Sequence, residues 1–365
     1  MKLLRFEFKK SFRTKWLPYF FLLTAIFIVA IFFRNIAQQD LIPLKKVEYF
    51  LDFSMDVARQ NHSDQMSLEE EPNPQLQEKL AIGQTLHQKL GELMKSIEEG
   101  EKESELRVEN EVYTQAMTYQ ELEGQFALSQ TEMQDMIQLN EQLLALNLTK
   151  EDEDLSVQQA VFMKKISTLL LSPIGFIIYL LVMGSMVTRE FEERNIQLVY
   201  TFPIPKWRYV LTKFSSLMAA GLAWLALIII LSYVLPLMLE QPEVTVFQYP
   251  LLLNTGQLIE IGTYLMKVYL LAASFLLFAI ALLVSLGFIF RSTIITYLVI
   301  FILFIIGWMI SSSGVLHVAN PFSYQEIHSV LMAYPFQLLP GYIVLIVSAT
   351  ALLLLTVMVT RKRGI

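Results

Sequence analysis

The chain has 365 residues, of which 54% are hydrophobic and 17% charged, with a net charge of −6 and no cysteine. A soluble domain is about a quarter charged, so this composition excludes an ordinary soluble protein, and the missing cysteines exclude disulfides and thiol chemistry. Residues 36–163 hold 26 of the 34 acidic and nine of the 28 basic residues, a charge of −17, while the remainder is +11.

Residues 1–16 form a basic, amphipathic start. Large apolar residues recur there at every fourth position: Leu4, Phe8, Phe12 and Trp16. This spacing predicts a helix lying in the membrane interface, which bends into the first span near Pro18. A basic flank with chance aromatic residues is the alternative. No small-residue cleavage site follows, so we expect a retained signal anchor.

Six apolar runs are long enough to cross about 30 Å of hydrocarbon as helices. They are residues 17–33, 166–188, 214–239, 268–290, 293–310 and 338–360. None of them contains aspartate or glutamate. Carriers driven by protons or sodium usually need such groups within the membrane, where a charge costs about 2.5–3.5 kcal/mol. We therefore expect any work to come from another subunit, on an apolar or amphipathic cargo.

The distribution of lysine and arginine predicts the orientation. These residues flank the spans at the N-terminal tail, in residues 189–213, at Arg291 and in the tail 361–365. The alternate connections, 240–267 and 311–337, contain only Lys267, at the border of the fourth span. The excess of positive charge indicates that both termini lie in the cytoplasm. The long acidic segment 34–165 is then extracytoplasmic.

The acidic segment has helical periodicity. Apolar residues at alternating spacings of three and four run from Leu76 to Ile97 and from Val108 to Phe126, with Gly100 between them. We expect a helical hairpin that turns at Gly100, and a third helix over residues 129–146. A ligand-binding module and a structural cap are both open. The fold class predicted overall is all-α integral membrane, with six transmembrane helices, an N-terminal interfacial helix and a large extracytoplasmic helical insert.

Residues 189–213 join the second and third spans and are the strongest functional candidate. They combine an acidic cluster, one apolar helical turn, a proline corner and a basic-aromatic end. The candidate residues are Glu190, Glu192, Glu193, Arg194, Leu198, Val199, Phe202, Pro203, Pro205, Lys206, Arg208 and Lys213. Proline stops a helix, so the corner is rigid and suited to carrying a push from a soluble partner. The alternative is a basic loop that only sets topology.

Motifs for chemistry are missing. There is no P-loop and no H-E-x-x-H or cysteine–histidine cluster. His317 and His328 lie in one outer connection beside Glu326, a weak zinc candidate. We therefore expect no catalytic, cofactor-binding or metal-binding residue, and no nucleic-acid partner.

The segment 189–213 resembles the loop between spans two and three of type-2 ABC (ABC-2) exporter permeases of bacteria, where a coupling helix docks into the ATPase. The amphipathic start, the six spans and the NPFSY sequence at Asn320–Tyr324 are similar too. Asn195, where glycine is common, and Pro205-Lys206, where serine-arginine is frequent, depart from the family pattern.

The resemblance implies the permease subunit of an ATP-driven exporter in the bacterial cytoplasmic membrane, with no catalysis of its own. Its partners would be two ABC ATPase subunits carrying ATP and Mg²⁺, a second copy or a similar permease, and membrane lipid. Two alternatives remain. One is a sensor or resistance subunit of such a complex that does not transport. The other is an intramembrane protease using Glu192 and Glu193.

Overall fold

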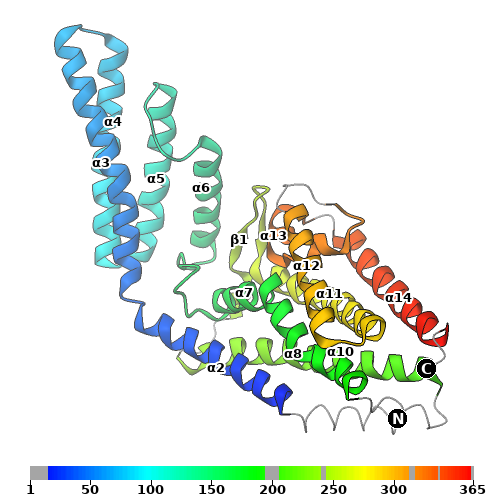
Figure 1. The fold of residues 1–365 in the computed structure, drawn as a ribbon. Helices are drawn as coiled ribbons and strands as arrows, with labels where there is room; N and C mark the ends of the chain where they lie inside the picture. Colours follow the sequence, from blue (N-terminus) through cyan, green and yellow to red (C-terminus); the bar gives the residue numbers. More distant parts are fainter. Residues whose placement is uncertain (1–14, 194–204, 240–243, 312–316, 336–337, 363–365) are drawn as a thin grey trace. The chain divides into compact units, whose positions relative to one another are not determined.

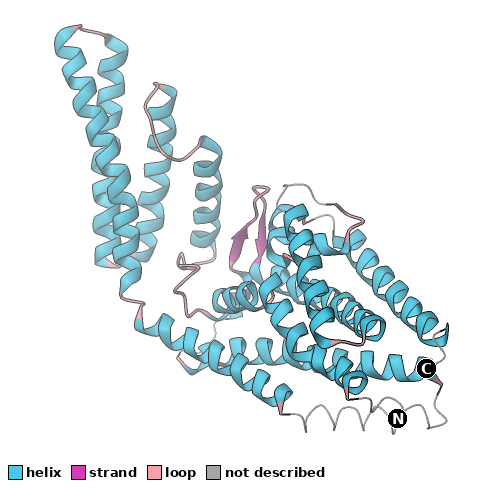
Figure 2. Cartoon of the chain, viewed as in Figure 1, coloured by secondary structure: helices cyan, strands magenta, loops and turns pink. Residues whose placement is uncertain are grey.

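The computed structural model describes residues 15–193, 205–239, 244–311, 317–335 and 338–362. These residues are almost wholly helical, and their one sheet is a small hairpin (Figures 1 and 2). The chain forms two compact units. The membrane unit comprises Met1–Phe32, Phe162–Gln241 and Gly262–Ile365, and the insert comprises Phe33–Val161 and Pro242–Ile261.

Six described helices are long and apolar enough to cross a membrane, which confirms the predicted fold class at this level. They are Trp16–Ala37, Pro173–Glu192, Lys206–Met238, Ile261–Phe290, Thr293–Ser311 and Leu338–Arg361. Figure 1 labels them α2 (Trp16–Ala37), α8 (Pro173–Glu192), α10 (Lys206–Val234), α11 (Ile261–Phe290), α12 (Thr293–Ser311) and α14 (Leu338–Lys362). The 3₁₀ turn η1 (Pro236–Met238) follows α10. Of the six, α11 is the most buried, whereas only about a quarter of the residues of α2, α12 and α14 are buried.

Shorter elements complete the membrane unit. The helix α7 (Gln159–Leu170) precedes α8, and η3 (Pro321–Tyr324) and α13 (Ile327–Ala333) lie between α12 and α14. The predicted second span, 166–188, is divided, because Pro173 is the first residue of α8 and Ser172 caps that helix by accepting a hydrogen bond from Gly175 N. The spanning helix therefore starts later than predicted and continues to Glu192.

An aromatic cluster around Trp224 of α10 forms the core of the membrane unit. The Trp224 ring stacks on Tyr179 of α8, with ring centroids 5.3 Å apart, and lies 5.6 Å from Phe20 of α2. The Tyr179 hydroxyl donates to the carbonyl of Leu217, and the indole N–H of Trp224 donates to Thr24. The hydroxyl of Tyr179 and the indole N–H of Trp224 are thus hydrogen-bonded within the protein, as buried polar groups in a membrane must be. Their bonds and the ring contacts hold α2, α8 and α10 together.

Four helices build the insert: α3 (Leu41–Glu70), α4 (Pro74–Glu99), α5 (Lys102–Glu121) and α6 (Gln130–Ala145). The predicted turn is confirmed, because Gly100 caps α4 in the left-handed conformation with φ at 72°. The predicted third helix is confirmed as α6, which Ser129 and Glu132 begin with a capping box. The 30-residue helix α3 was not predicted.

The core of the insert lies between α3, α4 and α5, with one residue of α6. It consists mainly of large apolar side chains: Phe50, Phe53, Val57, Leu86, Leu90, Leu93, Ile97, Val112, Tyr113, Ala116, Tyr119 and Met133. Burial on this scale stabilises by about 25 cal/mol per Å² of apolar surface. The insert therefore holds itself together without disulfides.

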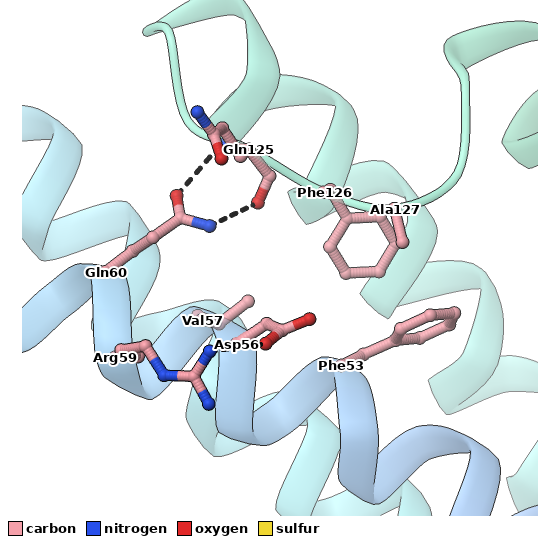
Figure 3. Close-up of a pocket in the computed structure, with 8 residues that line it drawn as sticks. All are labelled: Phe53, Asp56, Val57, Arg59, Gln60, Gln125, Phe126 and Ala127. Atoms are coloured by element: carbon pink, nitrogen blue, oxygen red, sulfur yellow. Dashed lines mark hydrogen bonds and ion pairs between the residues drawn. The ribbon is translucent and has the colours of Figure 1, made fainter.

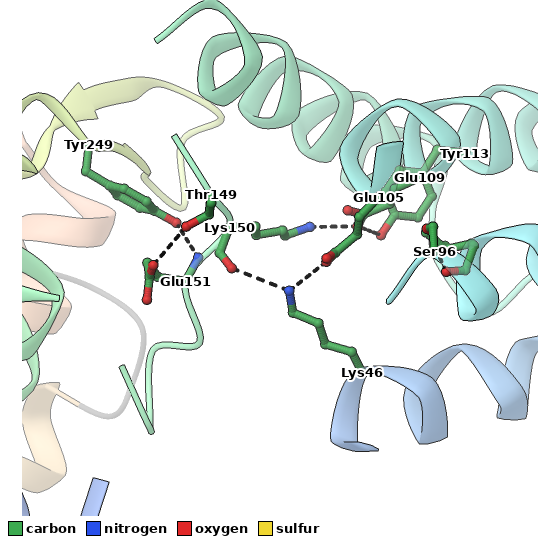
Figure 4. A network of polar contacts seen from close by, with 10 residues as sticks. Lys46, Ser96, Glu105, Glu109, Tyr113, Thr149, Lys150, Glu151 and Tyr249 are labelled. Atoms are coloured by element: carbon green, nitrogen blue, oxygen red, sulfur yellow. Dashed lines mark hydrogen bonds and ion pairs between the residues drawn. The ribbon is translucent and has the colours of Figure 1, made fainter. Parts of the chain in front are cut away.

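Polar contacts join α3 and α5 to the chain that follows α6 (Figure 4). Lys150 Nζ lies 2.6 Å from Glu109 Oε1, which also accepts the hydroxyl of Tyr113 at 2.7 Å. Burial, together with the Glu109 charge, raises the pKa of Tyr113. Glu151 N donates to the hydroxyl of Tyr249, beside the hairpin of β1 (Pro250–Leu252) and β2 (Leu258–Glu260). The short turn η2 (Val244–Gln248) precedes this hairpin.

A cleft of about 380 Å³ lies where α3 meets the loop between α5 and α6 (Figure 3). The carboxamide of Gln60 bonds both the main-chain N–H and the carbonyl of Gln125, each at 2.9 Å. The rings of Phe53 and Phe126 lie 5.0 Å apart, and Asp56 pairs with Arg59 on the surface. The loop is thereby held on α3.

Candidate functional site

The last turn of α8 sends successive side chains to three different helices. Glu190 contacts α10, Phe191 contacts α11, and Glu192 contacts the start of α12. Successive residues of an α-helix point about 100° apart, so three in a row face three directions. This turn immediately precedes residues 194–204, which lie outside the described residues.

Glu190 forms a buried ion pair with Lys213 of α10. The two groups are 2.8 Å apart, and their side chains are only 6% and 4% exposed. Lys213 also donates to the carbonyl of Met186 and lies 5.6 Å from the ring centre of Tyr209. These two predicted site residues therefore meet each other within the chain. Their charges are balanced locally, which permits burial at the end of the spans.

Phe191 links α8 to both α11 and the turn that follows it. Its ring centre is 5.2 Å from that of Phe288 of α11, which also contacts Tyr209 at 5.8 Å. The guanidinium of Arg291 lies over the Phe191 ring at 6.0 Å. Arg291 has φ at 58°, a conformation that glycine usually adopts after a helix, and its N–H closes the end of α11 on Gly287 O.

Glu192 caps the start of α12. Its Oε1 accepts the backbone N–H of Thr293, the first residue of α12, at 2.6 Å. The first N–H groups of a helix have no partner within the helix, and its N-terminus favours a negative charge. An exposed carboxylate of α8 therefore supplies a cap that α12 needs.

The contact between α8 and α12 continues toward the middle of the membrane unit. The hydroxyls of Thr188 and Thr293 are hydrogen-bonded, and Tyr297 donates to the carbonyl of Leu181. Gly184 makes this approach possible, because a Cβ there would meet the Tyr297 ring at 2.2 Å. Sequence reasoning missed Thr293 and Tyr297, since no local pattern connects residues about a hundred positions away.

The other predicted site residues have different positions. Glu193 is exposed and pairs with Arg189 on its own helix. Pro205 is the residue before α10, Lys206 begins that helix, and exposed Arg208 lies against the Trp207 ring. The remaining candidates lie outside the described residues: Arg194, Leu198, Val199, Phe202, Pro203, and Leu4, Phe8 and Phe12 of the expected interfacial helix. Trp16 is described and is 63% exposed.

The six described spanning helices contain two carboxylates, Glu190 and Glu192, both in the last turn of α8. They lie near the end of α11, which is Phe290. His328 of α13 lies at the opposite end of that helix, where its Nδ1 is 2.8 Å from the hydroxyl of Tyr264. Tyr264 and Phe288 mark these two ends and are about 24 helical residues apart, roughly 36 Å, so the carboxylates and this histidine do not share a water.

No group of three potential metal ligands occurs among the described residues. His328 Nδ1 lies within hydrogen-bond distance of Thr168 as well as of Tyr264. Burial lowers the pKa of His328 to about 4, and the charge of Lys164 acts in the same direction. His328 therefore serves in the packing of α13 on α7 and α11.

Six apolar helices of spanning length define a multi-pass membrane protein. The family model for the ABC-2 family transporter protein matches residues 1–360, and the chain belongs to this family. It is thus a permease component of an ABC transporter, a class that is generally not catalytic itself, and its family implies an ABC ATPase partner. No curated protein and no solved structure matched the chain.

Proposed function

We propose that this chain is the transmembrane permease subunit of an ATP-driven exporter, and that its ATPase acts through residues 189–213. ATP and Mg²⁺ are bound by the ATPase, which closes and opens during hydrolysis. Its movement displaces the segment after α8, and the helices joined there follow. The chain supplies the path across the membrane, and the partner supplies the free energy.

The last turn of α8 is the observation that carries this proposal. It is the place where α8, α10, α11 and α12 are all joined by side chains, and it lies directly before the predicted apolar turn and proline corner. The spans offer no carboxylate elsewhere, which argues against a path powered by a coupling ion. A partner that pushes at this end reaches four spans through one turn.

Orientation and assembly follow from the charge pattern and from symmetry. The lysine and arginine excess supports a cytoplasmic location for both termini and for residues 189–213, in a cytoplasmic membrane. Two ATPase subunits and two permeases, either identical or similar, would form a closed two-fold complex. The exposed apolar faces of α12 and α14 are available to lipid and to the second permease.

The cargo is apolar or amphipathic: a hydrophobic peptide, a lipid-like molecule or an antimicrobial. The reason is the apolar lining that spans of this composition offer, where a strongly charged solute pays a large desolvation cost. The insert, with a net charge of −17 over residues 36–163, would meet the cargo on the outer side.

Copurification tests the docking segment. The chain is solubilised in mild detergent, and the amount of ABC ATPase retained per chain is measured by quantitative mass spectrometry. Replacing Leu198, Val199 and Phe202 together by alanine is expected to abolish retention, because an apolar helix face docks by burying those side chains. The matched control replaces three exposed apolar residues of α2, Leu22, Leu23 and Ile26, and is expected to retain the ATPase.

Retention of the ATPase by the triple variant at the wild-type level would overturn the docking assignment. A wild-type chain that retains no ABC ATPase under any mild condition would overturn the proposed function itself.

A further inference from the structure

We propose that Glu192 is a positioning residue that gives α12 its own mechanical link to the chain between α8 and α10 (residues 193–205, the coupling segment), separate from the link that Glu190 and Lys213 give to α10. The proposal rests on the function proposed above. It assigns to Glu192 a role inside the chain, at the first backbone N–H of α12.

Three stripes along α8 face three neighbours. Residues 184, 188 and 192 contact α12: a Cβ on Gly184 would meet Tyr297, Thr188 bonds the hydroxyl of Thr293, and Glu192 bonds its N–H. These positions are four apart, so they lie on one face of the helix.

The other two stripes face other helices. Val187 and Phe191 contact α11, where a Cβ on Gly287 would meet Val187 at 2.7 Å and where the Phe191 ring meets Phe288. Lys213 of α10 donates to the carbonyl of Met186 and to the carboxylate of Glu190. Each stripe ends in the last turn of α8, so a displacement of that turn reaches three helices by three separate contacts.

Among the α8 residues that contact α12, Glu192 is the one next to the segment that follows α8. Glu192 is the last residue of α8, and the coupling segment begins immediately after it. Glu192 accepts the backbone N–H of Thr293, which is the first residue of α12. A negatively charged acceptor is favourable there because the N-terminus of a helix carries a partial positive charge. Beyond Tyr297 about half of the α12 side chains are exposed, and the far part of the helix contacts α11 and η3. The ring centre of Phe304 lies 6.0 Å from that of Phe275 and 5.9 Å from that of Phe322. α12 is therefore held over its first turns by α8 and farther along by α11 and η3.

Because the contacts are separate, the responses of α10 and α12 can be separated. Removing the Glu192 acceptor takes away the contact between the last turn of α8 and the first N–H of α12, whereas the hydroxyl contact of Thr188 with Thr293, one turn earlier, remains. The ion pair between Glu190 and Lys213 is on another face and remains. The α12 response to nucleotide is therefore reduced, while the α10 response persists.

The chain contains no cysteine, which permits single labels without a background. One form carries an environment-sensitive fluorophore at Leu298→Cys on α12, and another carries it at Leu211→Cys on α10; these positions are 60% and 38% exposed. Each is reconstituted in nanodiscs with the ATPase that copurifies with the chain. The spectral shift on adding ATP, and on trapping with vanadate, is recorded.

With wild-type Glu192 both labels are expected to shift. Glu192→Ala reduces the shift at position 298 and leaves the shift at 211 at the wild-type size. Glu192→Gln keeps an oxygen acceptor for Thr293 N and retains the full shift at 298. Glu192→Asp keeps the charge but withdraws the carboxylate by one methylene, and it reduces the shift as Glu192→Ala does. These three variants therefore distinguish the position of the acceptor oxygen at residue 192 from the negative charge of that side chain.

An unchanged shift at position 298 in both Glu192→Ala and Glu192→Asp overturns the inference and leaves the proposed function standing. Loss of both shifts in Glu192→Ala, with the ATPase still bound, also overturns it, because the contact would then not be specific to α12. If neither wild-type label responds to nucleotide in the assembled complex, the proposed function fails instead.

Discussion

Lys213→Met removes the buried ammonium group that faces Glu190, and it is expected to destabilise the membrane unit strongly. The two groups are 2.8 Å apart and almost fully buried, so they cannot exchange their partner for water. Breaking such a pair costs about 3–5 kcal/mol, because a charge is left in a medium that solvates it poorly. Glu190→Gln is expected to cost a similar amount, because Lys213 then loses its carboxylate partner and its buried charge is unpaired.

The double variant Glu190→Gln with Lys213→Met carries no charge there, and most of the stability is expected to return, since an uncharged replacement of a buried pair is often near neutral. The free energy of unfolding is measured by denaturant titration in micelles, as a double-mutant cycle. A loss below about 1 kcal/mol in the single variants, the size typical of exposed pairs, would refute this reasoning. So would a double variant no more stable than either single one.

Three further predictions concern other parts of the chain. Gly184→Ala is expected to lower stability by about 1–3 kcal/mol, because the added Cβ collides with the Tyr297 ring of α12. Gly91→Ala, in an exposed position of α4 with no atom within 4 Å of the added Cβ, should raise stability by about 0.5–1 kcal/mol. Thermal denaturation compares the two variants. Stability should fall by about 3 kcal/mol as the pH is lowered from 6.5 to 4, because the unfolded state protonates His328 at its ordinary pKa of 6.5 and the folded state only near 4; melting curves of His328→Gln should lack this part of the pH dependence. Lys150→Met should speed amide exchange in α5 by about 100-fold, corresponding to about 3 kcal/mol, because the buried carboxylate of Glu109 loses its cation, and adding Glu109→Gln should reverse the effect.

The six spans could be predicted from the sequence because hydropathy alone specifies them. The first and last residues of these spans were harder to predict. Glu190 and Lys213 were assigned to the connection between spans, since each charge alone is costly in a span, yet they neutralise each other inside the helix ends. The break before Pro173 also escaped notice, because the residues on both sides are apolar.

Within the insert, the turn at Gly100 has a local signature, but α3 does not. The buried face of α3 includes Ser54 and Asn61 beside its aromatic residues, so its apolar pattern is interrupted. Ser54 is accommodated there by a hydrogen bond with His87 of α4, which depends on tertiary contact. The β1–β2 hairpin has only three residues per strand, too short for an alternating pattern to show.

The sequence predicts only part of the candidate site. The acidic cluster is visible in the sequence, but the different partners of Glu190 and Glu192 are not, because those partners lie 23 and 101 residues farther along the chain. Only the fold assigns one carboxylate to α10 and the other to α12.

We propose that a separate ATPase drives this chain through the segment after α8. The most direct measurement is the rate of ATP hydrolysis by that ATPase in nanodiscs, with the wild-type chain, with the Leu198, Val199 and Phe202 alanine variant, and without the chain. We expect the rate of hydrolysis to change several-fold when the wild-type chain is present and to return to the value of the isolated ATPase with the variant. The same rate in all three preparations would contradict it.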